Sequence, residues 1–355
     1  MDKLYRELVD LPGAPSFEKP VKEYMRKNLA PYVDEIIEDK LGSIYGIINK
    51  GYDGPKVMLA GHMDEVGAIV IGIKKNGLIK MSNLGGVNGD VFLSQHMDII
   101  TDDLEKIPGV TASVPPHLSR ESGSSTKKLV FTDLLLDIGA DSDEHAKELG
   151  VKVGQQIIIH NNFTVSKDGK KYFSKAWDDR FGCGISLEVA KEIKKEELEC
   201  ELYVGANVQE EVGLRGAETA GNMVSPDVFL AVDTSPCADV FDGDDISGKI
   251  GGGFLLRFYD PRAIMHQGMK KFIIEEAEKH NVKFQYYKSM GGTDAARVQL
   301  ANDGVLVATI GMPARYIHST TSMISEDDYL EVKKMVMIVI KALNKAKVEE
   351  IRANV

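Results

Sequence analysis

Five separate segments of this chain carry histidine or acidic side chains next to apolar, strand-like runs. In an open α/β sheet, ligand sites gather beyond the carboxyl ends of the strands, so these side chains are expected to meet in one crevice. The residues are His62 and Asp64 after the run 57–60, Glu210 and Glu211 after 202–208, Asp233 after 228–232, His318 beyond 305–310, and Asp178 with Asp179 before a helix expected from about residue 180.

The types of these residues favour a site for two divalent cations. Histidine and carboxylate ligands without a thiolate suit Zn²⁺, Co²⁺ or Mn²⁺. When two such ions lie about 3.5–4 Å apart, one carboxylate can bind both of them. With Asp178 as the shared ligand, His62 and Asp233 complete the set of one ion. Glu211 and His318 complete the set of the other.

Two further acids are expected to assist these ligands. Asp64 stands two residues beyond His62, where its carboxylate can accept the imidazole N–H. Glu210 adjoins Glu211 but should point elsewhere, so it can act as general base for a metal-activated water. The alternative is that these acids are ordinary turn or helix caps and that the histidines are structural. Spacing alone leaves these readings open and does not separate peptides from other amide substrates.

The elements that must position these residues alternate between helices and buried strands. Helical periodicity covers 1–30 with a break at Pro12-Gly13, and from about 170 helices are expected at 180–195, 264–280 and 326–349. The stretch 69–165 instead has short β-rich runs separated by turns, including 114–117 and 119–125. We therefore predict a mixed-sheet α/β domain, formed by 1–68 and 166–355, that is interrupted by a small β-rich insertion at 69–165.

Composition excludes several other classes of protein. The 355 residues hold 43 Lys and Arg against 54 Asp and Glu, with no basic cluster for phosphate contacts, which argues against nucleic-acid binding. No apolar run approaches the roughly 18–20 residues that cross a membrane, and no secretory leader is recognised. The three cysteines, Cys183, Cys200 and Cys237, are odd in number and far apart, so no disulfide framework is indicated. A reducing cytoplasm is the expected location.

Seven stretches around these residues resemble the M42 family of metallopeptidases, and within it the bacterial glutamyl aminopeptidase branch. The seven stretches occur in the same order as in the family, from near residue 60 to residue 318. Seven matches in order indicate the family far more specifically than a match to any single stretch. The stretches are Ala60-Gly-His-Met-Asp-Glu-Val-Gly67, Ser174-Lys-Ala-Trp-Asp-Asp-Arg180, Asn207-Val-Gln-Glu-Glu-Val-Gly-Leu-Arg-Gly216, Phe229-Leu-Ala-Val-Asp-Thr-Ser-Pro236, Arg257-Phe-Tyr-Asp-Pro261, Gly291-Gly-Thr-Asp-Ala295 and Ala314-Arg-Tyr-Ile-His318.

The resemblance implies two divalent metal ions per subunit, zinc or cobalt with manganese as a further option, and Asp64 and Glu210 as catalytic partners. It also implies that 69–165 is a PDZ-like dimerisation domain and that dimers assemble into tetrahedral dodecamers enclosing the active sites. Departures from the family pattern, such as Gly85-Gly-Val-Asn88 and Ser319-Thr-Thr-Ser322, leave the metal ligands intact and bear on substrate preference and subunit contacts. The metal ligands that the resemblance implies are His62, Asp178, Glu211, Asp233 and His318.

The resulting functional hypothesis is removal of the N-terminal residue of peptides, with Glu or Asp as the favoured residue. Arg257 is the candidate for binding an acidic side chain through its guanidinium fork, and a structural ion pair is the alternative reading. Other hypotheses are an aminopeptidase of broader neutral specificity, a glycosidase of the endoglucanase type, and a non-catalytic peptide-binding assembly protein. A chelator separates them, since it stops a metallopeptidase but not a typical carboxylate glycosidase.

Overall fold

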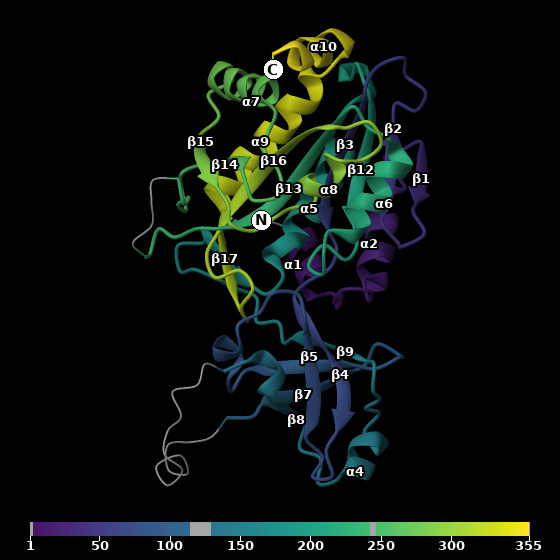
Figure 1. The fold of residues 1–355 in the computed structure, drawn as a ribbon, viewed down its shortest axis with the longest axis vertical. Coiled ribbons are helices and arrows are strands. Elements are labelled where there is room, and N and C mark those ends of the chain that lie inside the picture. The colour runs from purple at the N-terminus through teal and green to yellow at the C-terminus, as the bar shows by residue number, and fades with distance from the viewer. Residues whose placement is uncertain (1–2, 114–128, 242–245, 355) are drawn as a thin grey trace.

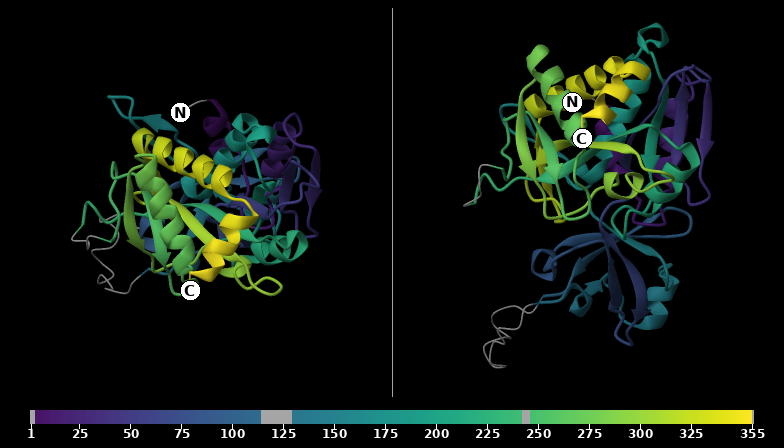
Figure 2. Two further views of the ribbon diagram at one scale, coloured as in Figure 1. Left: turned by 90° about the horizontal axis from the view of Figure 1, so that it is seen from above. Right: turned by 45° about the horizontal axis from the view of Figure 1, so that its top comes forward.

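The computed structural model describes residues 3–113, 129–241 and 246–354. A larger α/β part lies next to a smaller β-rich part, and the chain leaves the first, forms the second and returns (Figure 1). The right-hand view in Figure 2 shows the same division. The turns predicted at 114–117 and 119–125 lie outside the described residues.

The larger part is organised around one mixed sheet. Four neighbouring strands at its centre, β12, β3, β13 and β16, run parallel to one another. Their carboxyl ends therefore lie at one edge of the sheet. In spatial order the strands are β1 (Glu35–Glu38), β2 (Ile44–Ile48), β12 (Glu201–Asn207), β3 (Lys56–His62), β13 (Val228–Pro236), β16 (Leu306–Ala314), β14 (Phe254–Tyr259) and β15 (Phe284–Lys288).

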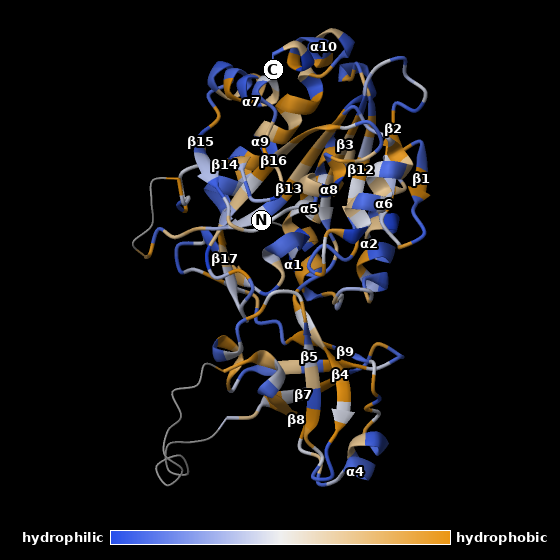
Figure 3. Ribbon diagram, viewed as in Figure 1, coloured by the Kyte–Doolittle hydropathy of each residue, from blue (hydrophilic) through white to orange (hydrophobic). Residues whose placement is uncertain are grey.

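Helices cover both faces of this sheet. One face carries the larger apolar core, to which α1 (Lys3–Asp10), α2 (Lys19–Leu29), α5 (Trp177–Glu192), α7 (Gln267–Lys279), α9 (Glu326–Ala342) and α10 (Lys345–Ala353) contribute. The other face carries a smaller core with α6 (Arg215–Val224) and α8 (Ala295–Val298). In Figure 3 the central strands of the sheet are largely orange (hydrophobic), whereas helices such as α7 and α10 carry many blue (hydrophilic) residues. This is an α/β layer arrangement with one helical layer much larger than the other.

Residue alternation along the strands explains the two cores. Val57 and Leu59 of β3 belong to the larger core, whereas Met58 and Ala60 belong to the smaller one. Successive side chains of a strand point to opposite faces, so His62 is expected on the same face as Met58 and Ala60. The end of β3 therefore directs the imidazole toward the side that α6 and α8 cover.

The smaller part is a closed barrel of antiparallel strands. Apolar side chains such as Val70, Met81, Ile99 and Ile157 fill its interior. Its strands, in spatial order, are β4 (Gly67–Ile73), β5 (Ile79–Leu84), β8 (Leu135–Asp137), β7 (Lys106–Thr111), β6 (His96–Ile100) and β9 (Gln156–Ile159). The helix α4 (Asp143–Glu148) and the short turns η1 (Gly89–Phe92) and η2 (Phe131–Asp133) accompany the barrel.

The remaining elements are small. A sheet of β10 (Thr164–Val165), β11 (Lys171–Ser174) and β17 (Ser322–Ser325) lies beside the main sheet, and η3 (Lys195–Glu197) follows α5. Within the described ranges no helix combines the length and the apolar character needed to span a bilayer.

The predicted fold class is confirmed: a mixed-sheet α/β part is interrupted by a small β-barrel. Some element boundaries differ from the prediction. The closing helix predicted at 326–349 is two helices, because the chain turns after Ala342 and the side chain of Asn344 caps α10 by accepting from the Lys347 N–H. The strand predicted at 228–232 continues to Pro236, since β13 stays paired with β16 along its whole length.

Candidate active site

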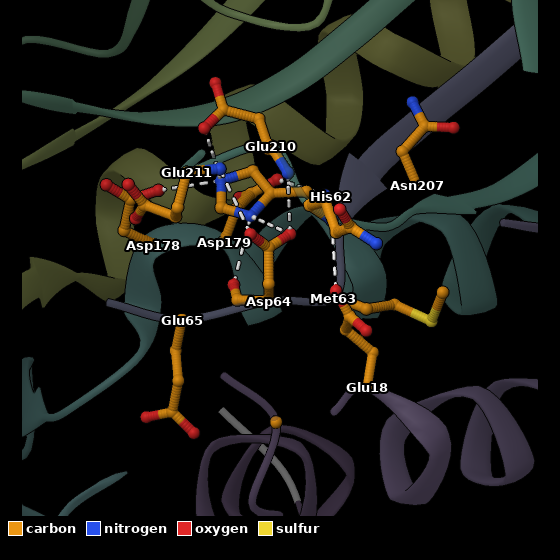
Figure 4. A network of polar contacts seen from close by, with 12 residues as sticks. Glu18, His62, Met63, Asp64, Glu65, Asp178, Asp179, Asn207, Glu210 and Glu211 are labelled. Atoms are coloured by element: carbon orange, nitrogen blue, oxygen red, sulfur yellow. Dashed lines mark hydrogen bonds and ion pairs between the residues drawn. The ribbon is translucent and has the colours of Figure 1, made fainter. Parts of the chain in front are cut away.

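The carboxyl ends of the central parallel strands bring the predicted residues together. His62 is the last residue of β3 and stands in register with Asn207, the last residue of β12. Glu210 and Glu211 follow three and four residues after Asn207, and Asp233 lies within β13 rather than beyond its end. The crevice expected from the strand order is therefore present, and Figure 4 shows part of it.

Two glycines allow the start of α5 to reach this crevice. Gly61 of β3 and Gly182 of α5 are so close that a Cβ on Gly61 would lie 2.7 Å from the Gly182 Cα. The backbone of Asp178 and Asp179 is not helical, and the peptide bond between them is cis. Asp179 is buried and accepts from the Gly182 N–H at 3.0 Å and the His62 N–H at 3.1 Å. These contacts hold Asp178 at the mouth of the crevice.

Asp178 lies between two imidazoles. Its Oδ1 is 3.1 Å from His62 Nε2, and its Oδ2 is 3.3 Å from His318 Nε2. Glu211 Oε1 is a further 3.4 Å from the same His318 nitrogen. Burial opposes the charge of the Asp178 carboxylate, but both histidines outweigh it and keep its pKa well below the usual range. One carboxylate thus has each of its oxygens facing a different histidine.

The other ring nitrogen of each histidine is held by a backbone carbonyl. His62 Nδ1 is 3.0 Å from the Asp64 carbonyl oxygen, and His318 Nδ1 is 2.7 Å from the Gly86 carbonyl oxygen. Gly86 follows barrel strand β5, so the inserted part of the chain orients one of the site histidines. With Nδ1–H donating to these carbonyls, Nε2 of each imidazole is free to bind a cation.

Asp64 contacts more than the expected histidine. The side-chain Oδ1 of Asp64 is 3.5 Å from His62 Nδ1, whereas the backbone carbonyl oxygen of Asp64 is 3.0 Å from the same nitrogen. The two carboxylate oxygens instead accept from the backbone N–H groups of Glu210 and Glu211, at 2.9 and 3.0 Å. Asp64 therefore orients the two consecutive glutamates as well as the imidazole.

The acidic side chains of the site are buried close together. Burial raises the pKa of Glu211 to about 8 and that of Asp233 to about 7, and it raises the pKa of Glu210 well above its usual range. Glu211 Oε1 is buried with no hydrogen-bond partner among the described residues. So many carboxyl groups in one buried place, one of their oxygens without a hydrogen bond, are unfavourable unless protons or cations neutralise them.

The arrangement fits divalent cations. The structure contains two groups of possible ligand atoms, and within each group all atoms lie within 4.8 Å of one another. One group comes from His62, Asp178 and Glu211, and the other comes from His62, Glu210 and Asp233. The donors are imidazole nitrogens and carboxylate oxygens, as zinc, cobalt and manganese prefer. Glu210 belongs to the second group, with its Oε2 4.0 Å from His62 Nε2, so its carboxylate lies near the ligand atoms as well.

A cavity of about 1020 Å³ opens beside these residues. Asp178, Glu211, His318 and Arg257 are among the residues that line it. Arg257 is 6 % exposed and forms an ion pair with Asp260 at 3.3 Å. A structural ion pair was the alternative to a role of Arg257 in substrate binding. Its guanidinium also donates to the Gly291 carbonyl, and its Nε has no partner in the described part of the chain.

Sequence reasoning missed three groups that surround the site. Asn207 donates to Asp294 at 2.9 Å, and Asp294 belongs to the Gly-Thr-Asp-Ala stretch, which was a usable signal. Glu65 forms buried ion pairs with Lys175 and Arg180, at 2.6 and 3.3 Å, behind the ligand-bearing loop. The third is Glu18, more than forty residues before His62, for which no signal in the sequence existed.

Binding of a cation should release protons and should be tighter at higher pH. The pKa of Glu211 is about 8 and that of His318 about 10, the latter because Asp178 outweighs the effect of burial. Both groups therefore hold a proton at pH 7 and must lose it to act as ligands. We expect at least about one proton to be released per protein at pH 7 and the affinity to fall as pH drops from 8 to 6. Calorimetric titration with Zn²⁺ in buffers of different ionisation enthalpy measures this, and a heat independent of the buffer would contradict it.

Comparison with known proteins agrees with this geometry. The family model described as M42 glutamyl aminopeptidase matches residues 42–335. A glutamyl aminopeptidase of Lactococcus lactis is 40 % identical over 348 residues, which are 98 % of both chains. Both comparisons cover the residues of the site.

Solved structures share the whole fold. A TET aminopeptidase from a marine sediment archaeon, Thaumarchaeota archaeon SCGC AB-539-E09, superposes with a TM-score of 0.93 at 36 % identity, covering 98 % of this chain and 99 % of that one. The TET1 peptidase of Pyrococcus horikoshii, described as assembling into a tetrahedron or a large octahedral shell, has a TM-score of 0.86 at 28 % identity over 96 % and 99 % of the chains. The chain therefore belongs to the M42 glutamyl aminopeptidase family, and it is an aminopeptidase.

Proposed function

We propose that this aminopeptidase removes single, preferentially acidic residues from the N-termini of peptides with the help of two divalent cations. The observation that carries the proposal is the position of Asp178, whose two oxygens face His62 and His318 at 3.1 and 3.3 Å. A carboxylate in that position can serve two cations at once. The residues that would hold the cations are His62, Asp178, Asp233, Glu211 and His318.

The charge of this ligand set supports two cations. Asp178, Glu211 and Asp233 provide three negative charges, which nearly balance two divalent ions when both histidines are neutral. Bound cations supply Lewis-acid chemistry, which polarises the scissile carbonyl and makes a water molecule more acidic. Zinc and cobalt suit the donors best, with manganese as a further option.

Glu210 is the proposed general base. Its side chain is 11 % exposed, and its Oε2 is 4.0 Å from His62 Nε2, so it lies beside the ligands and still reaches the cavity. Glu210 takes a proton from the attacking water as the C–O bond forms, and it gives that proton to the leaving nitrogen as the C–N bond breaks. Burial raises the pKa of the Glu210 carboxyl, which makes its carboxylate form a stronger acceptor for the proton of water.

Acidic specificity is supported by three cationic residues in the lining of the cavity. Arg257 is already paired with Asp260, so the ion pair offsets part of its charge. Arg262 and Lys288 are exposed, and neither forms an ion pair with any described residue. We therefore assign recognition of the substrate carboxylate to Arg262 and Lys288, supported by Arg257 from the buried side.

The test is hydrolysis of aminoacyl-p-nitroanilides with N-terminal Glu, Asp or Leu, before and after treatment with EDTA. We expect Glu to be preferred over Leu, and activity to vanish with EDTA and to return with Zn²⁺ or Co²⁺. Lys288→Met should lower kcat/KM for Glu about 10- to 100-fold more than for Leu, since a charged hydrogen bond contributes about 1.5–3 kcal/mol. Arg257→Ala should act in the same direction.

The matched control is Lys194→Met, an exposed lysine outside the cavity lining, which should leave the Glu to Leu ratio unchanged. Equal losses for Glu and Leu in both cavity variants would remove the acidic assignment and leave an aminopeptidase of broader specificity. Full activity after removal of the metals would remove the two-cation proposal itself.

The inserted segment 69–165 is proposed to mediate dimerisation, with dimers assembling further into a dodecamer. The barrel exposes large apolar side chains, Val153 at 65 % and Leu104 at 57 %, which line one surface hollow together, and contiguous exposed apolar surface is typical of an interface. The assembly described for the Pyrococcus horikoshii protein also supports it. Three buried free cysteines support the proposal of a cytoplasmic location.

A further inference from the structure

Three consecutive backbone amides of the segment that bears Glu210 are held by two buried carboxylates. Asp64 accepts from the N–H groups of Glu210 and Glu211. The third amide, that of Gln209, donates to Glu18 Oε1 at 3.0 Å. Glu18 is 5 % exposed and comes from the N-terminal segment, far from Gln209 in the sequence. Figure 4 includes Glu18 among the residues of the surrounding network.

Glu18 holds two residues whose backbone is left-handed. Its Oε1 also accepts from the Ser16 N–H at 2.8 Å. Ser16 has φ 76° and Gln209 has φ 55°. Residues other than glycine adopt this conformation at an energetic cost, so the surrounding structure must favour it. A buried carboxylate that accepts from both amides is a direct reason for the chain to keep these two turns.

Helix capping does not account for this side chain. Glu18 stands at the N-cap position of α2, but its carboxylate makes no capping bond to that helix. The carboxylate is buried close to Asp64, and burial followed by the charge of Asp64 raises its pKa to about 7. A buried acid beside a second acid is unfavourable, which indicates that its bonds to the two turns outweigh the cost.

The position of Gln209 gives its amide a specific influence on Glu210. β12 ends at Asn207, whose carbonyl accepts from the Met63 N–H at 2.8 Å, so the strand is fixed up to that point. Beyond it, the carbonyls of Gln209 and Glu210 accept from residues 213–215 at the start of α6. Glu211 keeps its own contact with Asp64. Loss of the Glu18 contact therefore releases the Gln209 amide, directly before Glu210, while the amides of Glu210 and Glu211 stay bound to Asp64.

We propose that Glu18 is a positioning residue that fixes the backbone at Gln209 and thereby the orientation of the Glu210 carboxylate. The proposal rests on the proposed role of Glu210 as general base. It assigns Glu18 no contact with the substrate or with the cations. Its effect should therefore fall on kcat, and both KM and the metal content should change little.

The test compares Glu18→Ala with Glu18→Gln in the full-length protein loaded with Zn²⁺. The alanine variant should lower kcat about 10- to 100-fold with KM within about threefold, since a small misplacement of a reacting group has effects of this size. The glutamine variant retains an oxygen that can accept from both amides, and it should restore kcat to within about threefold of the wild type. Amide hydrogen exchange at Gln209 should be faster in the alanine variant only, while exchange at Glu211, whose amide stays bound to Asp64, should change little.

Glu23→Ala, an exposed position on the same helix, is the matched control and should behave as the wild type. Three results would overturn the proposal: an unchanged kcat in Glu18→Ala, a loss of kcat in step with loss of zinc, or a glutamine variant no better than alanine. Glu210→Gln is measured alongside. If that variant keeps full activity, the general base is wrong; if it is inactive and Glu18→Ala is normal, only the positioning role is wrong.

Discussion

Replacing Glu210 with glutamine should lower kcat by about 10²- to 10⁴-fold, the range that general acid–base catalysis contributes. Glutamine has nearly the same size and shape, but it cannot take a proton from water. Asp64 binds the backbone amide of this residue and not its side chain, so the segment should keep its conformation. The measurement is steady-state hydrolysis of Glu-p-nitroanilide together with the zinc content of the purified variant.

Glu196→Gln is the control for this change, because Glu196 is exposed on the short turn η3 and away from the cavity. It should have wild-type kcat. Glu210 also lies within reach of the ligand atoms, so a variant that loses zinc along with activity would make Glu210 a ligand instead of the base. Full turnover with zinc retained would exclude both roles.

Asp178→Asn should abolish binding of at least one cation and most of the activity. In the wild type, each oxygen of Asp178 faces a different imidazole nitrogen. Asparagine keeps only one of these oxygens. Its NH₂ group takes the place of the other and faces the second imidazole nitrogen. Loss of an outer contact to a metal ligand already weakens binding 10- to 100-fold, so loss of a shared ligand should weaken it by more than about 100-fold. Calorimetric titration with Zn²⁺ gives the affinity and the number of ions.

The matched control is Asp303→Asn. Asp303 is exposed and forms no ion pair with any described residue. The zinc stoichiometry of this variant should equal that of the wild type. An Asp178→Asn protein that still binds two ions with wild-type affinity would show that the cations do not share this carboxylate. Circular dichroism should accompany the titration, since Asp178 lies at the tightly packed start of α5.

Much of the fold was predictable because its signals are local. Apolar runs of strand length, helical periodicity and the change of texture between 69 and 165 each depend on neighbouring residues. The residues of the site were found because they follow such runs, and His62, Glu210 and Glu211 occupy the places that the strand ends predict. The split of the closing helix was missed, although Asn344 is a typical capping residue.

The partners of these residues could not be predicted in the same way. For Arg257 the sequence left open a carboxylate-binding role and a structural ion pair, and in the structure Asp260 pairs with it at 3.3 Å. Asp64 was assigned to His62, and its carboxylate lies 3.5 Å from that imidazole but also accepts from the amides of Glu210 and Glu211. Each of these outcomes depends on side-chain direction and backbone turns, which the spacing of residues does not specify.

By itself, the sequence determined the element types, the insertion within the chain, and the presence of imidazoles and carboxylates at strand ends. Only the tertiary structure decided that Asp178 faces both His62 and His318, that Gly86 orients His318, and that Glu18 holds Gln209. The physical reason is distance along the chain. Local preferences act between near neighbours, whereas these contacts join residues separated by more than one hundred positions, and only the packed sheet, helices and barrel bring them together.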